Sequence, residues 1–428
     1  MRALYLLAAY LAAPLHAGLL MWRSRCQRSQ WRRFGERFGL GPAVPGRPVW
    51  VHAASVGEVQ IAAVLVKGLR ERFPGTPVLL TAFTPTGIGR AQALSPSVAT
   101  RCLPYDLPGS VRRFLDRVQP RLAIMLETEL WPNFYRQCRR KGVPLVIASA
   151  RLSARSARRY RLLGALVREA LATATVAAQS AADAERFVSI GADSERVHVI
   201  GNLKFDFTPP ADIDGRGKRL RARYAANRPL WVAGSTHEGE EQAVLTAHRR
   251  LREVHPQALL VLAPRHPSRF AEVGALLGAR GIEFVSHSRA AAAQAAGSAE
   301  VLLLDTLGEL LDFYAAADAA FVGGSLVPVG GHNLLEPASL GVPLLSGPHQ
   351  FNAAEIARLL TERGGAVIVH NAAEMAVCLS AWLSDAGARH RIGAIARAVV
   401  EENRGALQRL LRLLEPMMSL PRPGPHSS

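Results

Sequence analysis

Short apolar runs alternate with longer amphipathic segments along most of this chain. Apolar runs of this length, bounded by glycine, proline or polar residues, are typical of the buried strands of a parallel sheet. Segments with apolar residues at every third or fourth position are typical of helices that cover a sheet, and residues 57–72 and 238–254 have this pattern. The predicted strands are 49–52, 78–82, 122–126, 145–148, 176–179, 230–233, 259–263, 301–304, 319–322 and 343–345.

The alternation of strands and helices predicts an α/β fold built from parallel βαβ units. With 428 residues, the chain is too long for one core. Its halves also echo each other, because Arg-Pro-Val-Trp-Val at 47–51 leads to Gly57-Glu58, and Arg-Pro-Leu-Trp-Val at 228–232 leads to Gly239-Glu240. Chance similarity between βαβ units is the alternative explanation. We predict two Rossmann-like domains that face a cleft.

The predicted domain boundaries follow from shifts in composition along the chain. Residues 208–227 are rich in Pro, Asp, Gly and Arg, which favours a linker, and the prolines after residue 418 favour disorder. The predicted parts are a membrane anchor with a basic flank at 1–33, a first domain at 34–207, a linker at 208–227, a second domain at 228–414 and a disordered tail at 415–428.

The N-terminal segment is an almost uncharged apolar run over residues 3–22, followed directly by five arginines within 23–33. About 20 apolar residues suffice for one bilayer crossing, and a basic flank stays on the cytoplasmic side. A secretory signal is disfavoured because the basic region follows the apolar run instead of preceding it. Pro14 and His16 interrupt the run, so the alternative is a helix that lies in the membrane interface.

The formal net charge of +18 indicates an anionic partner, which could be nucleic acid, an acidic membrane or a phosphorylated substrate. An arginine-biased composition is the alternative explanation. Aromatic residues make up only 6% and do not alternate with basic ones, which argues against a nucleic-acid partner. The four cysteines are far apart and form no cluster with histidine, so we predict neither a disulfide framework nor a metal site.

The segment 323–348 is the strongest candidate for ligand binding. The apolar run 319–322 ends in two glycines, and after a loop Gly330-Gly331-His332-Asn333 opens a short helix that carries Glu336. In an open α/β sheet, ligands bind at the carboxyl ends of strands, where glycines let the backbone approach a phosphate and a helix start offers free N–H groups. Glu336 could accept hydrogen bonds from ribose hydroxyls. The segment therefore predicts a nucleotide cradle.

Other polar groups in the second half also follow predicted strands. Ser235 lies in a turn of small residues, Arg265 is placed to hold a phosphate, and the turn Thr306-Leu307-Gly308 could contact a base through its backbone. The sequence has no GxGxxG fingerprint with an acidic partner, no Walker A motif and no Asp-x-Asp motif. We therefore expect arginine, lysine and helix dipoles, with no metal, to neutralise a leaving phosphate.

Two carboxylates in the first half also lie at predicted strand ends. Glu58 could act as a general base toward a substrate hydroxyl, or it could only complement the dipole of the helix that begins there. Glu127 could face the cleft, whereas Glu129 is better explained by capping. Ser55 and Lys204 are possible substrate contacts, since Lys204 could meet an anionic group.

Nine motifs together resemble the 3-deoxy-D-manno-octulosonic acid (Kdo) transferases. In chain order they are SVGEV, ETELWPN, SARLSARS, GNLKFD, AGSTHEGE, APRHP, DTLGEL, GGSLVPVGGHNLLEPASLG and GPHQFNAAEI. The resemblance covers nearly everything from about residue 34 to about residue 414. It implies a GT-B fold and an inverting, metal-independent transfer of Kdo from CMP-Kdo to the 6′-hydroxyl of a lipid A precursor, lipid IVA. It also implies a role in lipopolysaccharide core biosynthesis, at the cytoplasmic face of a bacterial inner membrane.

The resemblance also implies roles for individual residues. Glu58 matches the proposed general base and Glu127 matches a second required carboxylate. The predicted donor site consists of Ser235, Arg265, Thr306, Leu307, Gly308, Gly331, Asn333 and Glu336.

The implied partners are CMP-Kdo as donor substrate, a lipid A precursor and membrane lipids, with no further cofactor. The alternatives are another GT-B nucleotide-sugar transferase or epimerase, and a membrane-tethered binder of anionic lipid.

Overall fold

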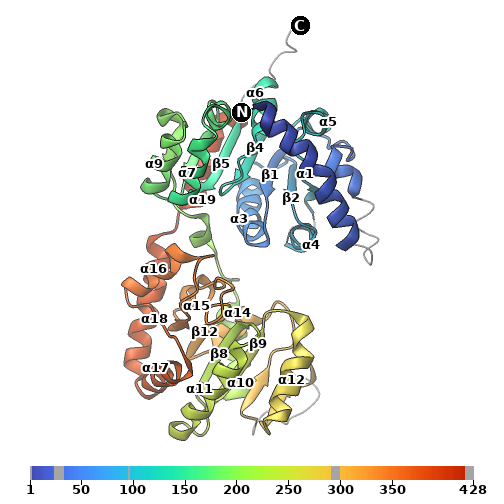
Figure 1. Cartoon of the computed structure of the whole chain (residues 1–428). Coiled ribbons are helices and arrows are strands. Elements are labelled where there is room, and N and C mark those ends of the chain that lie inside the picture. Colours follow the sequence, from blue (N-terminus) through green and yellow to red (C-terminus); the bar gives the residue numbers. More distant parts are fainter. Residues whose placement is uncertain (1, 24–32, 95–96, 291–298, 420–428) are drawn as a thin grey trace. The chain divides into compact units, whose positions relative to one another are not determined.

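The computed structural model describes residues 2–23, 33–94, 97–290 and 299–419. The chain forms two compact units (Figure 1). The first consists of Met1–Asp206 with Arg404–Ser428, and the second of Phe207–Asn403. Each unit is built on its own seven-stranded sheet, and all recorded strand pairs in both sheets are parallel.

The first sheet has the strand order β3-β2-β1-β4-β5-β6-β7. Its strands are β1 (Val49–Ala53), β2 (Val78–Ala82), β3 (Ala99–Cys102), β4 (Leu122–Leu126), β5 (Leu145–Ala150), β6 (Thr175–Ala178) and β7 (Val197–Val199). The helices of the first unit are α1 (Arg2–Arg23), α3 (Val56–Arg72), α4 (Pro85–Leu94), α5 (Pro108–Val118), α6 (Pro132–Arg140), α7 (Ala154–Leu162), α8 (Ala165–Leu171), α9 (Ala181–Ser189) and α19 (Ala406–Met418), with 3-10 turns η1 (Phe34–Phe38), η2 (Ser194–Arg196) and η3 (Leu203–Asp206).

Helices cover both faces of this sheet, which is why its central strands read as continuous apolar runs. Alternate residues of β1 point to opposite faces: Val49 and Val51 pack with α3 and α19, whereas Trp50 packs against Phe114 and Phe134 of α5 and α6. The two faces therefore form two separate apolar cores that hold the strand ends in place.

The second sheet has the strand order β10-β11-β9-β8-β12-β13-β14. Its strands are β8 (Leu230–Thr236), β9 (Leu259–Pro264), β10 (Phe284–Ser286), β11 (Val301–Leu303), β12 (Ala319–Val322), β13 (Leu344–Ser346) and β14 (Ala366–Ile368). The helices of the second unit are α10 (Ile213–Ala225), α11 (Glu240–Val254), α12 (Phe270–Ala279), α13 (His287–Ala290), α14 (Leu310–Ala316), α15 (Leu335–Ser339), α16 (Ala354–Glu362), α17 (Ala372–Ser384) and α18 (Ala386–Glu402), with the 3-10 turn η4 (Pro267–Arg269).

The predicted strands are all present, and the α/β prediction is confirmed. Four strands were not predicted from the sequence, namely β3, β7, β10 and β14, which are the edge strands of the two sheets.

The unit boundaries differ from those predicted at three places. The second domain was expected to reach residue 414, but α19 belongs to the first unit because Leu410, Leu411 and Leu414 join the core beside α3. The predicted linker contains α10, which packs so closely on α14 that a Cβ on Gly217 would meet Ala315 at 2.8 Å. The tail prediction is also wrong at its start, since α19 continues to Met418, and residues 420–428 lie outside the described ranges.

Helix α1 packs along the first unit through one of its faces. The Tyr5 hydroxyl donates to Asp106 at 2.6 Å, His16 Nδ1 lies 3.1 Å from the Tyr105 hydroxyl, and Ala13 is buried in a small apolar cluster with Tyr105. Its other face leaves Leu4, Leu7, Tyr10, Leu11 and Leu15 exposed. Within the described ranges, no helix is long and apolar enough to cross a membrane. The predicted basic flank falls mostly at 24–32, outside those ranges.

Candidate functional site

Both sheets have a switch point beside their first strand. β1 lies between β2 and β4, and β8 lies between β9 and β12. At such a point the connections leave on opposite faces, which opens a crevice outside the carboxyl ends of the strands. Glu58 and Glu127 follow β1 and β4, Ser235 lies near the carboxyl end of β8, and Gly331 follows β12. Each unit therefore carries its candidate residues at its switch point.

The Glu58 side chain completes a variant of the capping box at the start of α3, in which the carboxylate reaches the residue before the N-cap. Ser55 is the N-cap residue, and its Oγ accepts from the Glu58 N–H at 3.3 Å. In return, Glu58 Oε2 accepts from the Ala54 N–H at 2.7 Å and Oε1 accepts from the Ser55 hydroxyl at 2.9 Å. The capping alternative from the sequence is thus present in the structure, and it fixes the direction of the carboxyl group.

The same carboxyl group is also strongly perturbed. Burial raises the pKa of Glu58 to about 7, the nearby carboxylates Glu127 and Glu129 raise it further, and the Ala54 N–H opposes the shift. A carboxyl group that titrates near neutral pH is matched to general-base chemistry. Glu58 is therefore both a capping residue and a suitable proton acceptor, and the structure brings it close to Glu127.

Glu127 has a positive φ of 55°, which is uncommon for a residue with a side chain. Its carboxylate forms an ion pair with Lys204, with Oε1 2.9 Å from Nζ. Both side chains are about a quarter exposed or less, so the pair is partly shielded from water. Backbone strain of this kind concentrates at functional sites. The structure thus joins two predicted residues that are 77 positions apart in the chain.

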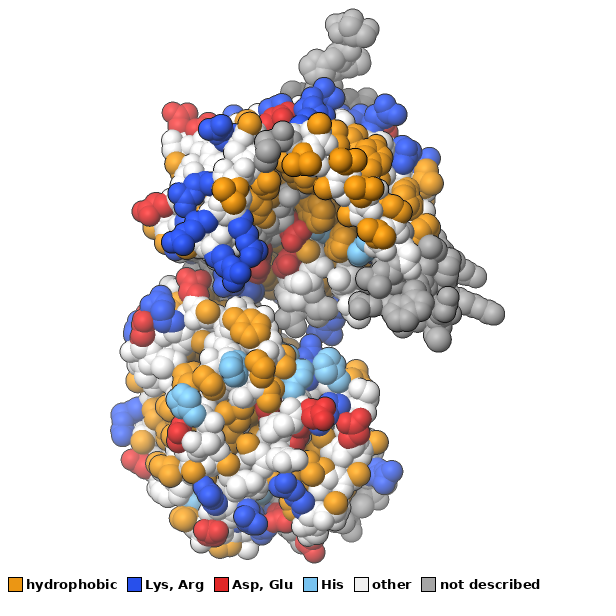
Figure 2. Space-filling view, viewed as in Figure 1, with side chains coloured by type: hydrophobic (Ala, Val, Ile, Leu, Met, Phe, Trp, Pro, Cys, Tyr) orange, Lys and Arg blue, Asp and Glu red, His pale blue; other side chains and the backbone are white. Residues whose placement is uncertain are grey.

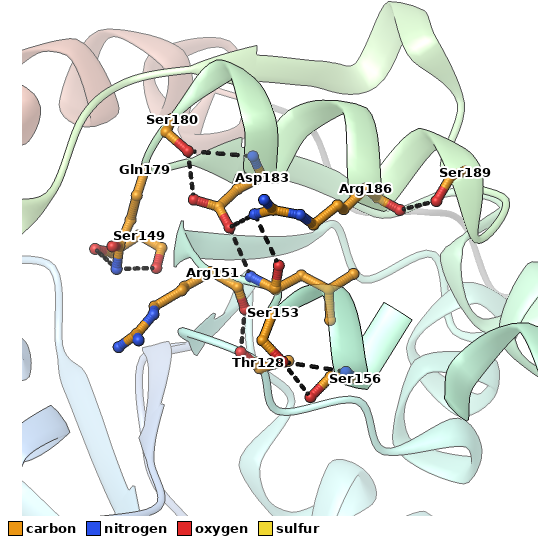
Figure 3. A network of polar contacts seen from close by, with 11 residues as sticks. Thr128, Ser149, Arg151, Ser153, Ser156, Gln179, Ser180, Asp183, Arg186 and Ser189 are labelled. Carbon is orange, nitrogen blue, oxygen red and sulfur yellow. Dashed lines mark hydrogen bonds and ion pairs between the residues drawn. The ribbon is translucent and has the colours of Figure 1, made fainter. Parts of the chain in front are cut away.

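A polar network that includes Thr128, the residue after Glu127 in the chain, fixes the loop that follows β5 (Figure 3). Thr128 donates from its hydroxyl to the Arg151 carbonyl, and the Asp183 carboxylate accepts from the Leu152 N–H at 2.9 Å. Arg186 donates to the Leu152 carbonyl at 3.2 Å and pairs with Asp183. In Figure 3 the Arg151 guanidinium points away from these contacts. The network therefore holds the loop by its backbone and leaves the arginine head outside it.

In the second unit, Glu240 organises the glycine loop after β12. Its buried carboxylate accepts from the N–H groups of His237, Gly324, Ser325 and Leu326 at 2.7–2.9 Å. Gly330 and Gly331 donate their N–H groups to the Gly324 carbonyl at 3.0 and 2.7 Å. These backbone donors of the predicted cradle are therefore engaged within the protein.

The other predicted donor residues lie in the loops at the same sheet edge. Ser235 has a positive φ of 57° and lies at an irregularity between β8 and β9, while the Arg265 N–H donates to the Thr236 carbonyl at 2.9 Å. Asn333 donates from its side-chain amide to Glu336 at 3.1 Å and accepts from the Leu335 N–H. The turn with Thr306, Leu307 and Gly308 follows β11, two strands away from β8, and Thr306 contacts Glu309.

Sequence reasoning missed the histidines at this edge. His237 and His332 approach each other with 2.8 Å between their Nε2 atoms, and the ring of His266 lies 5.4 Å from that of His237. Burial and the neighbouring Arg265 lower the pKa of His332 to about 3. The positions of these histidines after predicted strands could have marked them as candidate site residues. The contact between His237 and His332 could not be predicted, because 95 positions separate them in the chain.

Among the described side chains, no group of three or more His, Cys, Asp and Glu is arranged to hold a metal ion.

Similar proteins point to one family. Residues 32–207 match the family described as 3-deoxy-D-manno-octulosonic-acid transferase (kdotransferase). The 3-deoxy-D-manno-octulosonic acid transferase of Haemophilus influenzae is 40% identical over 407 residues, which cover 94% of this chain and 94% of that protein. The Bordetella pertussis protein of the same name is 39% identical over 434 residues, which cover 97% of this chain and 99% of that protein.

A solved structure supports the fold alone. UDP-GlcNAc 2-epimerase from Neisseria meningitidis, bound to UDP-GlcNAc, aligns with a TM-score of 0.58 at 13% identity. The alignment covers 86% of this chain and all of that one. The chain thus has the α/β GT-B fold with two parallel Rossmann-like sheets.

Proposed function

Because this chain belongs to the 3-deoxy-D-manno-octulosonic acid (Kdo) transferase family of glycosyltransferase enzymes, we propose that it transfers Kdo from CMP-Kdo to the 6′-hydroxyl of a lipid A precursor with inversion. The observation that carries the assignment of the base is the Glu58 carboxyl group. It is buried at a strand end, oriented by Ser55 and Ala54, and has a pKa raised by that burial to about 7. The reaction belongs to lipopolysaccharide core biosynthesis.

The first unit handles the acceptor in this proposal. The deprotonated Glu58 removes the proton from the acceptor hydroxyl, and the oxygen attacks the Kdo anomeric carbon on the side opposite the departing CMP. The Glu127–Lys204 pair lies beside it, and Lys204 can move between Glu127 and an anionic group of the substrate. Glu127 then holds the lysine in place when no substrate is bound.

The second unit handles the donor nucleotide. Arg265 holds the phosphate, with Ser235 and the loop that contains Gly331 beside it. The Asn333 amide orients Glu336 toward the ribose hydroxyls, and the turn Thr306-Leu307-Gly308 contacts the cytosine base. The exposed Leu307 and the open surroundings of Gly308 leave room for a base at that turn.

We also propose that α1 attaches the protein to the cytoplasmic face of a bacterial inner membrane by lying in the interface plane. Tyr5, Ala9, Ala13 and His16 face the protein, whereas the exposed leucines form a stripe along the opposite face of the helix. Figure 2 shows hydrophobic side chains gathered over this part of the first unit. An amphipathic helix of this kind buries its apolar face at the boundary between headgroups and acyl chains.

A mass-spectrometric assay tests the reaction. Purified protein is given CMP-Kdo generated in situ and a tetra-acylated lipid A precursor, and the product should be heavier by one or more Kdo units. Glu58→Gln should lose about 10²–10⁴ in rate, because the amide cannot take the proton. A folded, CMP-binding Glu58→Gln variant with near-normal turnover would move the base elsewhere. Thermal stabilisation by UDP but not by CMP would favour a UDP-sugar enzyme instead.

A further inference from the structure

A cluster of basic side chains lies at the carboxyl edge of the second sheet. His237 follows β8, Arg265 and His266 follow β9, and His332 lies in the loop between β12 and α15. Figure 2 shows histidine side chains gathered on this edge of the second unit. The residues come from three neighbouring strands of the switch point.

Two of these histidines lie within hydrogen-bond distance of each other. The Nε2 atoms of His237 and His332 are 2.8 Å apart, and their rings are almost parallel, at 8°, with centroids 5.0 Å apart. A hydrogen bond between two imidazole nitrogens needs one N–H and one lone pair. Two neutral imidazoles can form this bond, which turns one donor nitrogen toward the other ring instead of toward a ligand.

The surroundings of the pair explain why it stays neutral. Burial lowers the pKa of both histidines, and for His332 the nearby Arg265, His237 and His266 lower it further. Around His237, Arg265, Arg269 and His266 disfavour a positive charge, and the carboxylate of Glu240 favours one. Arg269 is in turn paired with Glu238, Glu241 and Glu272. An additional anion beside the two histidines would favour their protonated, positively charged form.

The backbone donors near the pair are already engaged. Glu240 takes the N–H groups of Gly324, Ser325 and Leu326, and the Gly324 carbonyl takes those of Gly330 and Gly331. An anion that arrives at this edge therefore meets side-chain donors first. Arg265 presents the N–H groups of its guanidinium, and the histidines gain a second N–H only when they take up a proton.

We propose that His237 and His332 bind the phosphate of the donor nucleotide as a proton-coupled pair, taking up one proton from solvent when the phosphate binds. This inference rests on the proposed function, since it names the residues that meet the nucleotide phosphate. On proton uptake one ring becomes an imidazolium with two N–H groups, and the hydrogen bond between the rings opens so that both can donate to phosphate oxygens.

The coupling fits the charge change of the reaction. In CMP-Kdo the phosphate is a diester with one negative charge, whereas a phosphomonoester carries about 1.5–2 negative charges at neutral pH. The C–O bond between Kdo and the phosphate breaks with its electron pair on the phosphate oxygen. An imidazolium beside that oxygen offsets the added charge, and its proton returns to solvent when CMP leaves.

Isothermal titration calorimetry tests the proposal. The whole protein is titrated with CMP at pH 8 in two buffers of different ionisation enthalpy. We expect a net uptake of protons on CMP binding, and a CMP Kd that rises as the pH increases, because proton uptake is linked to binding. Cytidine, which lacks the phosphate, should bind without proton uptake. At pH 8 the CMP phosphate is already fully charged, so the uptake belongs to the protein.

Variants separate this role from simple packing. His332→Gln and His237→Gln should each abolish the proton uptake, whereas His370→Gln, an exposed histidine that pairs with Glu374, should keep it. CMP binding without proton uptake by the unaltered protein would overturn the proposal while leaving the donor assignment intact. A protein that does not bind CMP at all would overturn both. Because the unaltered protein gives the decisive value, the result does not depend on the variants folding.

Discussion

At the scale of single residues, Glu58 shows how a capping residue can also be a base. The capping box uses one lone pair on each carboxylate oxygen, which orients the group without neutralising it. Because burial and two neighbouring carboxylates raise the pKa of Glu58 to about 7, the deprotonated form increases as the pH rises through that value. We expect the transfer rate to rise over the same range, since only the deprotonated form accepts a proton.

The substitution Glu129→Gln tests whether a neighbouring carboxylate helps to raise the pKa of Glu58. The Glu129 carboxylate raises the pKa of Glu58, and it accepts a hydrogen bond from the Trp131 indole at 2.8 Å, which a glutamine oxygen can also accept. Glu129→Gln should therefore shift the acidic limb of the pH–rate profile to lower pH and leave the rate at high pH unchanged. Steady-state kinetics between about pH 5.5 and about pH 9 measure this shift. A limb that stays in place would show that Glu129 does not contribute to the raised pKa of Glu58.

The candidate site could be predicted in part from the sequence. Glu58 and Glu127 were found because they follow apolar runs, and adjacent parallel strands bring such positions to one edge. The role of Glu240 was hidden, because a buried glutamate at a helix start looks like ordinary capping. Only the folded chain shows that it accepts from the loop at 324–326, more than 80 residues away.

At the scale of elements, the missed strands have one physical cause. β3, β7, β10 and β14 are the edges of the two sheets, and their residues are mostly half-buried or exposed. An edge strand has a partner on one side only, so it needs no continuous apolar run. The central strands are buried at nearly every position, and their sequences could be recognised for that reason.

The start of helix α19 is capped by a residue that lies about 200 positions earlier in the chain. The Asp206 carboxylate accepts from the N–H groups of Gly405 and Leu407, at 2.7 Å each, at the start of α19. Asp206→Ala should lower the stability of the first unit by about 2 kcal/mol, as for the loss of a strong helix cap. Urea unfolding measures the change. Asp212→Ala, which removes an exposed ion pair with Arg216, is the control and should change stability by less than about 0.5 kcal/mol.

Helix α1 makes a separate prediction about membranes. Leu7 and Leu11 are 58% and 60% exposed on its outer face. Leu7→Ser with Leu11→Ser should weaken sedimentation with anionic phospholipid vesicles without lowering the melting temperature, because these side chains contribute little to the core. Val254→Ser removes a valine that is 61% exposed on the second unit, and it should leave vesicle binding unchanged. Equal losses in both variants would rule out a specific role for α1.

At the scale of the whole molecule, the two units respond to acid in opposite ways. A carboxyl group with a raised pKa binds more protons when folded, so stability falls as the pH rises between its unfolded and folded values. Burial raises the pKa of Glu58 to about 7 and that of Asp106 to about 6, both in the first unit, where His52 opposes them. In the second unit, burial lowers the pKa of His248 and of His332 to about 3, so stability there falls as the pH drops through the range below 6.5.

Acidification from about pH 6.5 to about pH 5 should therefore weaken the second unit relative to the first, since the unfolded histidines gain protons that the folded ones exclude. Glu241 and Asp312, whose pKa values burial raises, reduce this effect in part. Hydrogen exchange followed by mass spectrometry, corrected for the intrinsic rates at each pH, reports on both units in one chain. His248→Gln can still accept the Trp231 N–H and should reduce the acid sensitivity of the second unit. Parallel loss of protection in both units would contradict the opposition of buried carboxyls and buried histidines.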